Sequence, residues 1–497
     1  MTTPSRRVAR KRESRRVPAL LRVLLLIALL ATLGIICFAI KTSVLDLDLW
    51  LHLMSGNWIA HHRAFPYTDP FSRTGAGRPW MAYSWIPELA LYFAYRLFGL
   101  TGIGLYGTFL TMSVASSVLW MTWRLSGRFL LSCILASMSC YAFLFNTMPR
   151  PVFLTMILVC ITLTLILLAN RSGNVRLLYW LPPIFLLWSN SHIQFIYGIA
   201  IVGLFVATTV AERAAARFGV LPSWVLSSTL PVGTLLLIFA SCIVASLMGP
   251  YSFRLYQEAY LYSQSKAMYS LITELQAIDF LSLRHYVQLL LTVAAFFILG
   301  WNKTIDLFKL LLLAGVSVIA YRAVRESWFV CVVALACIAD SIREKEEQDS
   351  RQVVRQIACA FAVAVLGLLL IAHRMNFDQQ GLTQAVGKEF PVRAADVIRE
   401  QKLPGPLYNT FRWGDFLIWY LPEYPVAIDG RADLYGDEIV KQFTKTSWGV
   451  DYVKDPYLNE SGVVLLQRTV PLVKFLAADP RFELLHKDDI SVVFRRR

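Results

Sequence analysis

The sequence predicts a mainly α-helical, polytopic membrane protein with about eleven transmembrane helices and a small C-terminal α/β domain. Of its 497 residues, 56% are hydrophobic and 16% are charged, whereas a soluble domain is about 45–50% apolar and about 25% charged. Apolar runs of roughly 15–23 residues recur along the first three quarters of the chain, and about 20 such residues cross a bilayer. The remaining quarter has ordinary charge density and short β-like runs.

The predicted spans alternate across the membrane in agreement with the charge of their connecting loops. When the N-terminus is placed inside, every predicted inside loop carries Lys or Arg, as the positive-inside rule requires. We therefore expect a basic cytoplasmic tail (1–19), a transmembrane domain (20–373) with a large first outside loop (41–99), and an extracytoplasmic domain (374–497) of an inner (plasma) membrane protein. The spans lie near 20–40, 100–123, 129–146, 151–169, 177–189, 195–211, 225–247, 286–300, 307–321, 327–339 and 353–372.

The net charge of +15 is explained by this topology. Its densest part is the N-terminal tail, which holds seven Arg and Lys residues between Arg6 and Arg16 against the single acid Glu13. Attraction to anionic lipid head groups accounts for such a tail, so membrane lipids are the expected partner and nucleic acid is not. All eight cysteines lie in apolar segments, which excludes a disulfide framework and a zinc-binding spacing.

Two outside loops have interfacial character. The loop 41–99 is rich in Trp, His, Tyr and Pro, residues that favour the head-group level, and its part from Ser84 to Phe98 has a helical pattern. The loop 251–280 is aromatic and amphipathic, which predicts a helix lying in the interface.

The tail alternates strand and helix patterns, which is typical of an α/β domain. Predicted strands cover 406–408, 424–428, 462–466 and 490–494, and predicted helices cover 392–401 and 469–478. Four acids follow the second of these strands. They predict a structural turn, with binding of an acceptor glycan as the alternative; they are Asp429, Asp433, Asp437 and Glu438.

Two carboxylates, Asp46 and Asp48, stand directly after the first predicted span. In an extended segment their side chains face the same way, so they could share a divalent metal such as Mg²⁺ or Mn²⁺, or one could act as a base that the other orients. Acids are costly in lipid and are usually functional at such positions. The alternative is the solvated edge of a loop.

Further motifs carry a family resemblance over nearly the whole chain. They are DLDLWLHL at 46–53, PYTDPFS at 66–72, WMAYSWIPE at 80–88, Arg150-Pro151, Asn190-Ser191-His192, WGDFLI at 413–418 and IDGRADLYG at 428–436. Together with the order of spans and tail, they resemble a bacterial group within the GT-C class of membrane glycosyltransferases. That class includes protein O-mannosyltransferases, aminoarabinose transferases and the catalytic subunits of oligosaccharyltransferase.

The resemblance implies transfer of a sugar from a polyprenyl-phosphate donor to an extracytoplasmic glycan, lipid or protein by an inverting hexosyl- or pentosyltransferase. A carboxylate would accept the proton of the attacking group; Asp48 is favoured slightly over Asp46. The lipid phosphate that leaves needs a cation beside it.

Other residues are candidates for binding the substrate. Arg150, Arg322 and Arg325 lie at predicted outside ends of spans, and the planar guanidinium suits phosphate; anchoring to head groups is the alternative. Arg322 and Arg325 would share one helical face. His52 shares a face with Asp48 if a helix begins there. The remaining candidates, each with a structural alternative, are His192, Asp69 and Glu88.

Three other functions fit parts of the pattern. A lipid-linked glycan polymerase or ligase would use similar arginines without needing the acidic pair. A non-catalytic GT-C-like scaffold would bind a partner through the tail. A transporter is less favoured, because the span centres have almost no charge and the chain shows no repeated halves.

Overall fold

The structure is a computed structural model that describes residues 43–143, 148, 150–264, 273–302, 304–343, 362 and 379–497. The predicted basic tail 1–19 and the predicted spans at 20–40 and 353–372 lie outside the described residues, apart from the backbone of residue 362.

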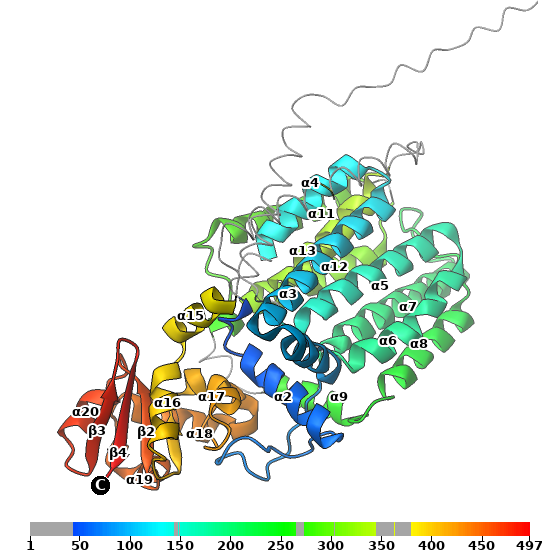
Figure 1. Cartoon of the computed structure of the whole chain (residues 1–497). Helices are drawn as coiled ribbons and strands as arrows, with labels where there is room; N and C mark the ends of the chain where they lie inside the picture. The colour runs from blue at the N-terminus through cyan, green and yellow to red at the C-terminus, as the bar shows by residue number, and fades with distance from the viewer. Residues whose placement is uncertain are drawn as a thin grey trace, which may run out of the picture.

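A bundle of apolar helices forms the larger part of the described chain (Figure 1). Each span predicted between 100 and 339 coincides with a helix. Helix α13 lies innermost, and every side chain from Ser327 to Ala339 is buried. The bundle helices are α3 (Trp85–Ser126), α4 (Phe129–Phe143), α5 (Val152–Ser172), α6 (Leu181–Ser189) after the 3₁₀ turn η2 (Val175–Trp180), α7 (Phe195–Arg217), α8 (Val232–Ser246), α11 (Leu283–Trp301), α12 (Leu307–Arg322) and α13 (Ser327–Ser341).

Four of these helices, α3, α5, α7 and α11, are long and apolar enough to cross a membrane. Several others are apolar but shorter, so the expected count of about eleven spans stays a prediction. Helix α3 is interrupted at Gly99, whose φ of 60° and ψ of −143° are accessible mainly to glycine. This break separates the interfacial helix predicted for 84–98 from the span predicted for 100–123.

The segment that carries the acidic pair differs from the expectation. The two acids would face the same way in an extended segment, but residues 46–48 form a turn. Asp48 has αR geometry (φ −70°, ψ −19°) as the N-cap of helix α2 (Leu49–His62), so a helix does begin there. Helix α2 crosses α3 so closely that a Cβ atom added at Gly56 would lie 2.1 Å from the Glu88 carbonyl oxygen. This contact fixes α2 against the bundle. Helix α9 (Arg254–Gln264) and the 3₁₀ turns η3 (Thr273–Leu275) and η4 (Val324–Glu326) complete this end of the bundle.

The tail contains a four-stranded sheet of order β1-β2-β4-β3. Strands β1 and β2 are parallel, and β2, β4 and β3 are successively antiparallel. Around the sheet lie α15 (Gln379–Glu389), α16 (Val392–Glu400), η5 (Phe411–Trp413), α17 (Gly414–Tyr420), α18 (Ala432–Ser447), η6 (Tyr452–Lys454), α19 (Pro456–Asn459) and α20 (Leu472–Ala478); the strands are β1 (Leu407–Asn409), β2 (Val463–Gln467), β3 (Phe482–Lys487) and β4 (Ser491–Arg496).

The strand predicted for 424–428 is wrong. The segment is buried, but its backbone pairs with a side chain and not with a neighbouring strand. The Asn409 side chain accepts a hydrogen bond from the Ala427 N–H (2.8 Å) and donates one to the Ile428 carbonyl (2.7 Å). A single bridge pairs Val426 with Ser72 of the first outside loop. The segment therefore connects the tail to that loop.

The tail also shares its hydrophobic core with α2. The Trp50 ring packs edge-on against Phe390 and Phe416, with centroids 5.6 and 5.2 Å apart, and the same cluster reaches Val463 and Val493 in the sheet. In Figure 1, α2 and α17 accordingly lie between the bundle and the sheet. The helix that follows the acidic pair thus belongs to both parts of the molecule.

Candidate active site

The guanidinium of Arg150 joins the two carboxylates of the acidic pair. Its Nε and Nη2 donate to Asp46 at 2.8 Å each, and its Nη1 lies 2.7 Å from Asp48 Oδ2. Arg150 directly precedes the turn into α5, and its side chain is 19% exposed. The turn at 46–48 therefore brings the two acids together around one cation rather than along one face of a strand.

The two carboxylates have unequal environments. The Asp46 side chain is 2% exposed and both of its oxygens accept from Arg150, whereas the Asp48 side chain is 42% exposed. Burial raises the pKa of Asp46 despite the Arg150 charge. Burial also acts to raise the pKa of Asp48, but the charges of Arg150, His52 and Arg325 outweigh it and lower that pKa. Asp48 is thus the accessible carboxylate that stays ionised.

His52 lies one turn along α2 from Asp48, because the His52 N–H bonds the Asp48 carbonyl. Its Nδ1 is 2.9 Å from Oε1 of Glu88 in α3, and Glu88 is 4% exposed. Two of the predicted substrate-binding residues therefore bond each other. A gap of about 10 Å³ beside them, bordered by Asp46 and Arg150, has roughly the volume of one water molecule.

A basic cavity of 220 Å³ adjoins the acidic pair. Arg150, Arg284 and Arg325 line it together with Gln288 and Trp328. Trp328 is 2% exposed and Gln288 is 1% exposed, yet the indole N–H of Trp328 and the amide oxygen of Gln288 have no hydrogen-bond partner among the described residues. Buried polar atoms are nearly always paired, so these two atoms indicate a site for a polar group. Three arginines and one carboxylate, Glu274, give the lining a net positive charge.

The structure separates Arg322 from Arg325, contrary to the expectation of one helical face. Helix α12 ends at Arg322, and Ala323 is extended (φ −140°, ψ 118°) before η4 begins. Arg322 is exposed, while Arg325 lines the basic cavity. The apolar run with two arginines resembled a continuous helix, but the chain turns between them.

His192 lies in the interior, where its Nδ1 is 3.0 Å from the Thr155 hydroxyl. Thr155 also accepts from the Trp188 indole at 2.9 Å. Burial and the charge of Arg325 hold the pKa of His192 well below its usual range, so the imidazole is neutral. Asn190 accepts from Trp85 and donates to the Met248 carbonyl, which ties the first outside loop to α8.

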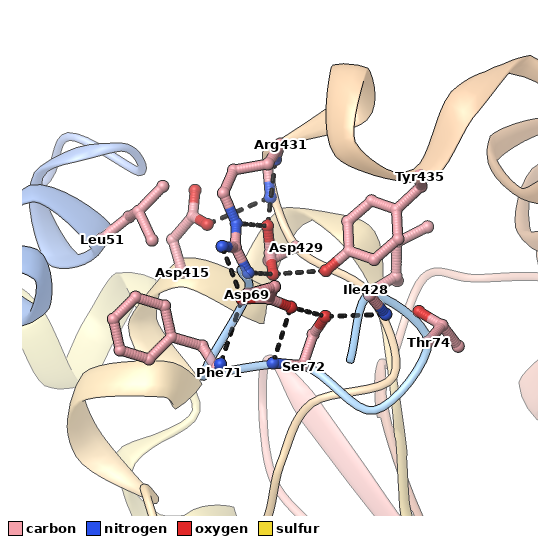
Figure 2. A network of polar contacts seen from close by, with 12 residues as sticks. Leu51, Asp69, Phe71, Ser72, Thr74, Asp415, Ile428, Asp429, Arg431 and Tyr435 are labelled. Carbon is pink, nitrogen blue, oxygen red and sulfur yellow. Dashed lines mark hydrogen bonds and ion pairs between the residues drawn. The ribbon is translucent and has the colours of Figure 1, made fainter. Parts of the chain in front are cut away.

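Asp69 belongs to a different polar network, drawn in Figure 2. Its carboxylate accepts from the backbone N–H groups of Phe71 and Ser72 and from Arg431 Nη1 at 2.7 Å. Arg431, 5% exposed, also donates to both oxygens of Asp429. The first outside loop is thereby joined to the tail through a buried ion cluster, and Asp69 is turned toward the tail rather than toward the acidic pair.

Asp415 brings a further carboxylate toward the acidic pair from the tail. It is 3% exposed, accepts from the Gly430 N–H at 3.0 Å, and lies close to Leu51 of α2 in Figure 2. Burial and the nearby charges of Asp429 and Asp48 raise its pKa well above the ordinary range. Burial thus favours the protonated form of Asp415, a residue that the sequence did not single out.

The acidic pair was a possible site for a divalent metal, with a base and its orienting partner as the other possibility, and its geometry fits a metal poorly. Arg150 already bridges the two carboxylates, and both Asp46 oxygens are engaged. A metal would have to displace a guanidinium that is held by three hydrogen bonds to one buried acid. Among the described residues, no group of three or more His, Cys, Asp or Glu side chains is placed to hold a metal ion.

Sequence reasoning missed several lining residues of the basic cavity. Arg284 and Gln288 lie one helical turn apart in the first half of α11, a spacing that could have indicated one polar face. Trp328 gave no signal, because a tryptophan at a span end is ordinarily an interfacial anchor. Glu274, 3.8 Å from Arg150, lies in a loop whose path the sequence does not define.

Comparison with known proteins finds similar solved structures but no matching family. No family model matches the chain, and no curated protein matches it. Similar solved structures include ArnT from Cupriavidus metallidurans bound to undecaprenyl phosphate and the same protein in the apo state, each 15% identical, with a TM-score of 0.45, covering 96% of this chain and 97% of that one.

Proposed function

We propose that this protein is a membrane glycosyltransferase that moves a sugar from a polyprenyl-phosphate donor to an acceptor on the outer side of the membrane. One observation carries the proposal: Arg150 contacts an accessible, ionised carboxylate and also lines a cavity that contains two further arginines, at the end of an apolar helix bundle. A base and an anion site side by side are what displacement of a phosphate from a sugar requires.

Asp48 is the proposed general base. An acceptor hydroxyl or amine attacks the anomeric carbon and forms the new bond while its proton passes to the Asp48 carboxylate. The bond from that carbon to the phosphate oxygen breaks, and its electron pair leaves with the polyprenyl phosphate. Because this is a single displacement, the anomeric configuration inverts. Asp46 holds Arg150 in place and thereby positions Asp48.

The basic cavity is the proposed site of the donor phosphate. Arg284 and Arg325 supply positive charge, and the unpartnered Trp328 N–H supplies a buried donor. Such groups stabilise the charge that develops on the leaving phosphate. The apolar surfaces of the surrounding helices would accommodate the prenyl chain.

The test is turnover by the purified full chain in nanodiscs. Polyprenyl-phosphate sugars and oligosaccharides on lipid diphosphate are supplied in separate reactions with candidate acceptors, and released lipid phosphate is measured. We expect release from at least one polyprenyl-phosphate sugar, and loss of that release in Asp48→Asn but not in the exposed control Asp489→Asn.

Two results would overturn the proposal. If no polyprenyl-phosphate sugar is cleaved with any acceptor, the protein is not this transferase. If only the lipid diphosphate donors are consumed, the polymerase or ligase function replaces it.

A further inference from the structure

A second, larger cavity lies apart from the basic one, between the first outside loop, α9 and α18. Its volume is 630 Å³, within the range of about 300–1,000 Å³ that is typical of ligand pockets. The loop supplies Arg78, Pro79, Trp80, Met81 and Tyr83; α9 supplies Glu258 and Leu261; and α18 supplies Asp433, Leu434, Gly436 and Asp437.

The walls of this cavity are held together by hydrogen bonds between its elements. Arg78 Nη1 donates to the carbonyls of Leu434 and Tyr435 at 3.2 and 2.9 Å, which fixes the loop to α18. The Tyr251 hydroxyl donates to the Pro66 carbonyl and accepts from the Ala82 N–H, which fixes the loop to the segment before α9. The cavity is therefore formed before any ligand binds.

The walls combine aromatic rings with carboxylates. Trp80 is half-buried, and Arg431 lies over its ring at 4.8 Å, so the indole is held in one orientation. Three carboxylates, Glu258, Asp433 and Asp437, border the same space. The guanidinium of Arg78, the cation among the lining residues, is engaged by backbone carbonyls.

We propose that this cavity binds a saccharide unit that carries no negative charge, as part of the acceptor. Aromatic rings pack against the C–H faces of a sugar ring, and carboxylates accept hydrogen bonds from its hydroxyl groups, which strengthens those bonds because the acceptor is charged. The same carboxylates repel uronic acids and phosphorylated sugars. The assignment to the acceptor rests on the proposed function; the binding itself does not.

The chemistry of Glu258 supports a hydroxylated ligand. Burial and the neighbouring charge of Asp433 raise the pKa of Glu258 to about 7. Near neutral pH this carboxyl therefore exists in both forms, one that donates a hydrogen bond and one that accepts. A sugar hydroxyl can hydrogen-bond to either form of Glu258, whereas an anionic group can accept a hydrogen bond only from the protonated form.

The experiment measures binding without any donor. The full chain in nanodiscs is applied to an array of immobilised mono- to hexasaccharides of the bacterial cell envelope, with neutral, amino-bearing and anionic members. We expect binding to neutral or amino-bearing saccharides and none to anionic ones. The double variant Glu258→Gln, Asp433→Asn should bind about tenfold more weakly or worse, while Glu438→Gln, outside the cavity, should bind as the wild type does.

Three outcomes overturn the proposal: no saccharide binds, only anionic saccharides bind, or the double variant binds like the wild type while its unfolding temperature is unchanged. If the double variant unfolds early, each single variant is tested at a temperature where it remains folded. Intact saccharide binding without any turnover would count against the proposed function alone.

Discussion

At the scale of residues, one cation organises two acids that would otherwise repel each other. Arg150 donates three hydrogen bonds to buried Asp46. It makes one contact with Asp48, whose side chain stays partly exposed. The roles proposed for the two acids, Asp48 as the base and Asp46 as the residue that positions Arg150, follow from this geometry. Sequence spacing alone gave no means of distinguishing them beyond a slight preference for Asp48.

Substitution of the two acids should therefore have different consequences. Asp48→Asn removes the proposed base at an exposed position, so we expect turnover to fall by about 10²–10⁴-fold with little change in unfolding temperature. Asp46→Asn leaves a largely buried guanidinium without its main partner, which should destabilise the protein by about 3–5 kcal/mol. Initial rates and thermal unfolding of both variants check this, and equal stability losses would contradict it.

Chelation of divalent metals should leave most of the activity intact. Arg150 already bridges the carboxylates that a metal would need. We expect initial rates of the proposed reaction after exhaustive EDTA treatment to stay within about twofold of those of the untreated protein, a change of less than about 0.5 kcal/mol in the barrier. Loss of activity that returns on addition of Mg²⁺ or Mn²⁺, but not of Ca²⁺, would refute this.

The pH dependence should report the charges around Asp48. Its lowered pKa means that folding favours the ionised form, so its contribution to stability is present above the unfolded pKa and is lost as the pH falls through the lowered one. Arg325 is among the charges that lower it, and Arg325→Gln should therefore move the acidic limb of the rate profile to higher pH. The exposed Arg322→Gln is the control and should not move that limb.

At the scale of elements, the position of α2 depends on a glycine contact. Gly56 lets α2 approach α3 so closely that Ala at this position would clash with the Glu88 carbonyl. Separation of the helices would also pull His52 away from Glu88. The sequence could not predict this contact, because a glycine inside a helical pattern can mark a close helix crossing, a kink or neither.

Gly56→Ala should destabilise the protein by about 1–3 kcal/mol through overpacking and reduce turnover. Gly315→Ala in α12 is the matched control, since nothing lies within 4 Å of its added Cβ, and it should stabilise by up to about 1 kcal/mol. Unfolding temperatures and initial rates of both variants are the measurements. A neutral Gly56→Ala would show that α2 can shift without consequence.

The elements that could be predicted are those whose pattern is long and uniform. Apolar runs located the bundle helices, and Trp85–Phe98 was recognised by its helical period. Shorter elements were governed by tertiary contacts instead. Strand β3 is half exposed, so its sequence alternates only weakly between apolar and polar residues. The apolar segment 424–428 resembled a strand, but its backbone pairs with the Asn409 side chain and not with a neighbouring strand.

The site could be predicted only in part for the same reason. The acidic pair and Arg150 lie at span ends, where polar residues stand out against apolar sequence. Arg284, Gln288 and Asp415 come from a helix face and from the tail, and only the folded chain places them near Arg150 or Asp48. Their roles depend on distant parts of the chain coming together in the fold, and no local sequence pattern indicates this.

At the scale of the whole molecule, the buried ion cluster of Figure 2 joins the first outside loop to the tail. Arg431 pairs with both Asp69 and Asp429 and lies over the Trp80 and Phe71 rings. Because the cluster is desolvated, removal of one partner leaves an unbalanced buried charge. Exposed ion pairs elsewhere in the tail contribute much less.

Asp69→Asn should therefore lower stability by about 3–5 kcal/mol and expose the connection between loop and tail to protease. Glu423→Gln, which breaks the exposed pair with Arg399, is the control and should change stability by less than about 1 kcal/mol. Thermal unfolding and limited proteolysis in nanodiscs distinguish them. Equal behaviour of the two variants would show that the cluster does not hold the parts together.

The hydrophobic cluster that Trp50 shares with Phe416 and Val493 has a consequence during biosynthesis. A ribosome releases the helix that follows Asp48 early and the strand that contains Val493 much later. Until that strand emerges, the early helix lacks part of its hydrophobic contact. A nascent chain arrested before residue 460 should therefore insert into the membrane yet remain inert, which would delay any reaction with the cell's lipid carriers until synthesis has nearly finished.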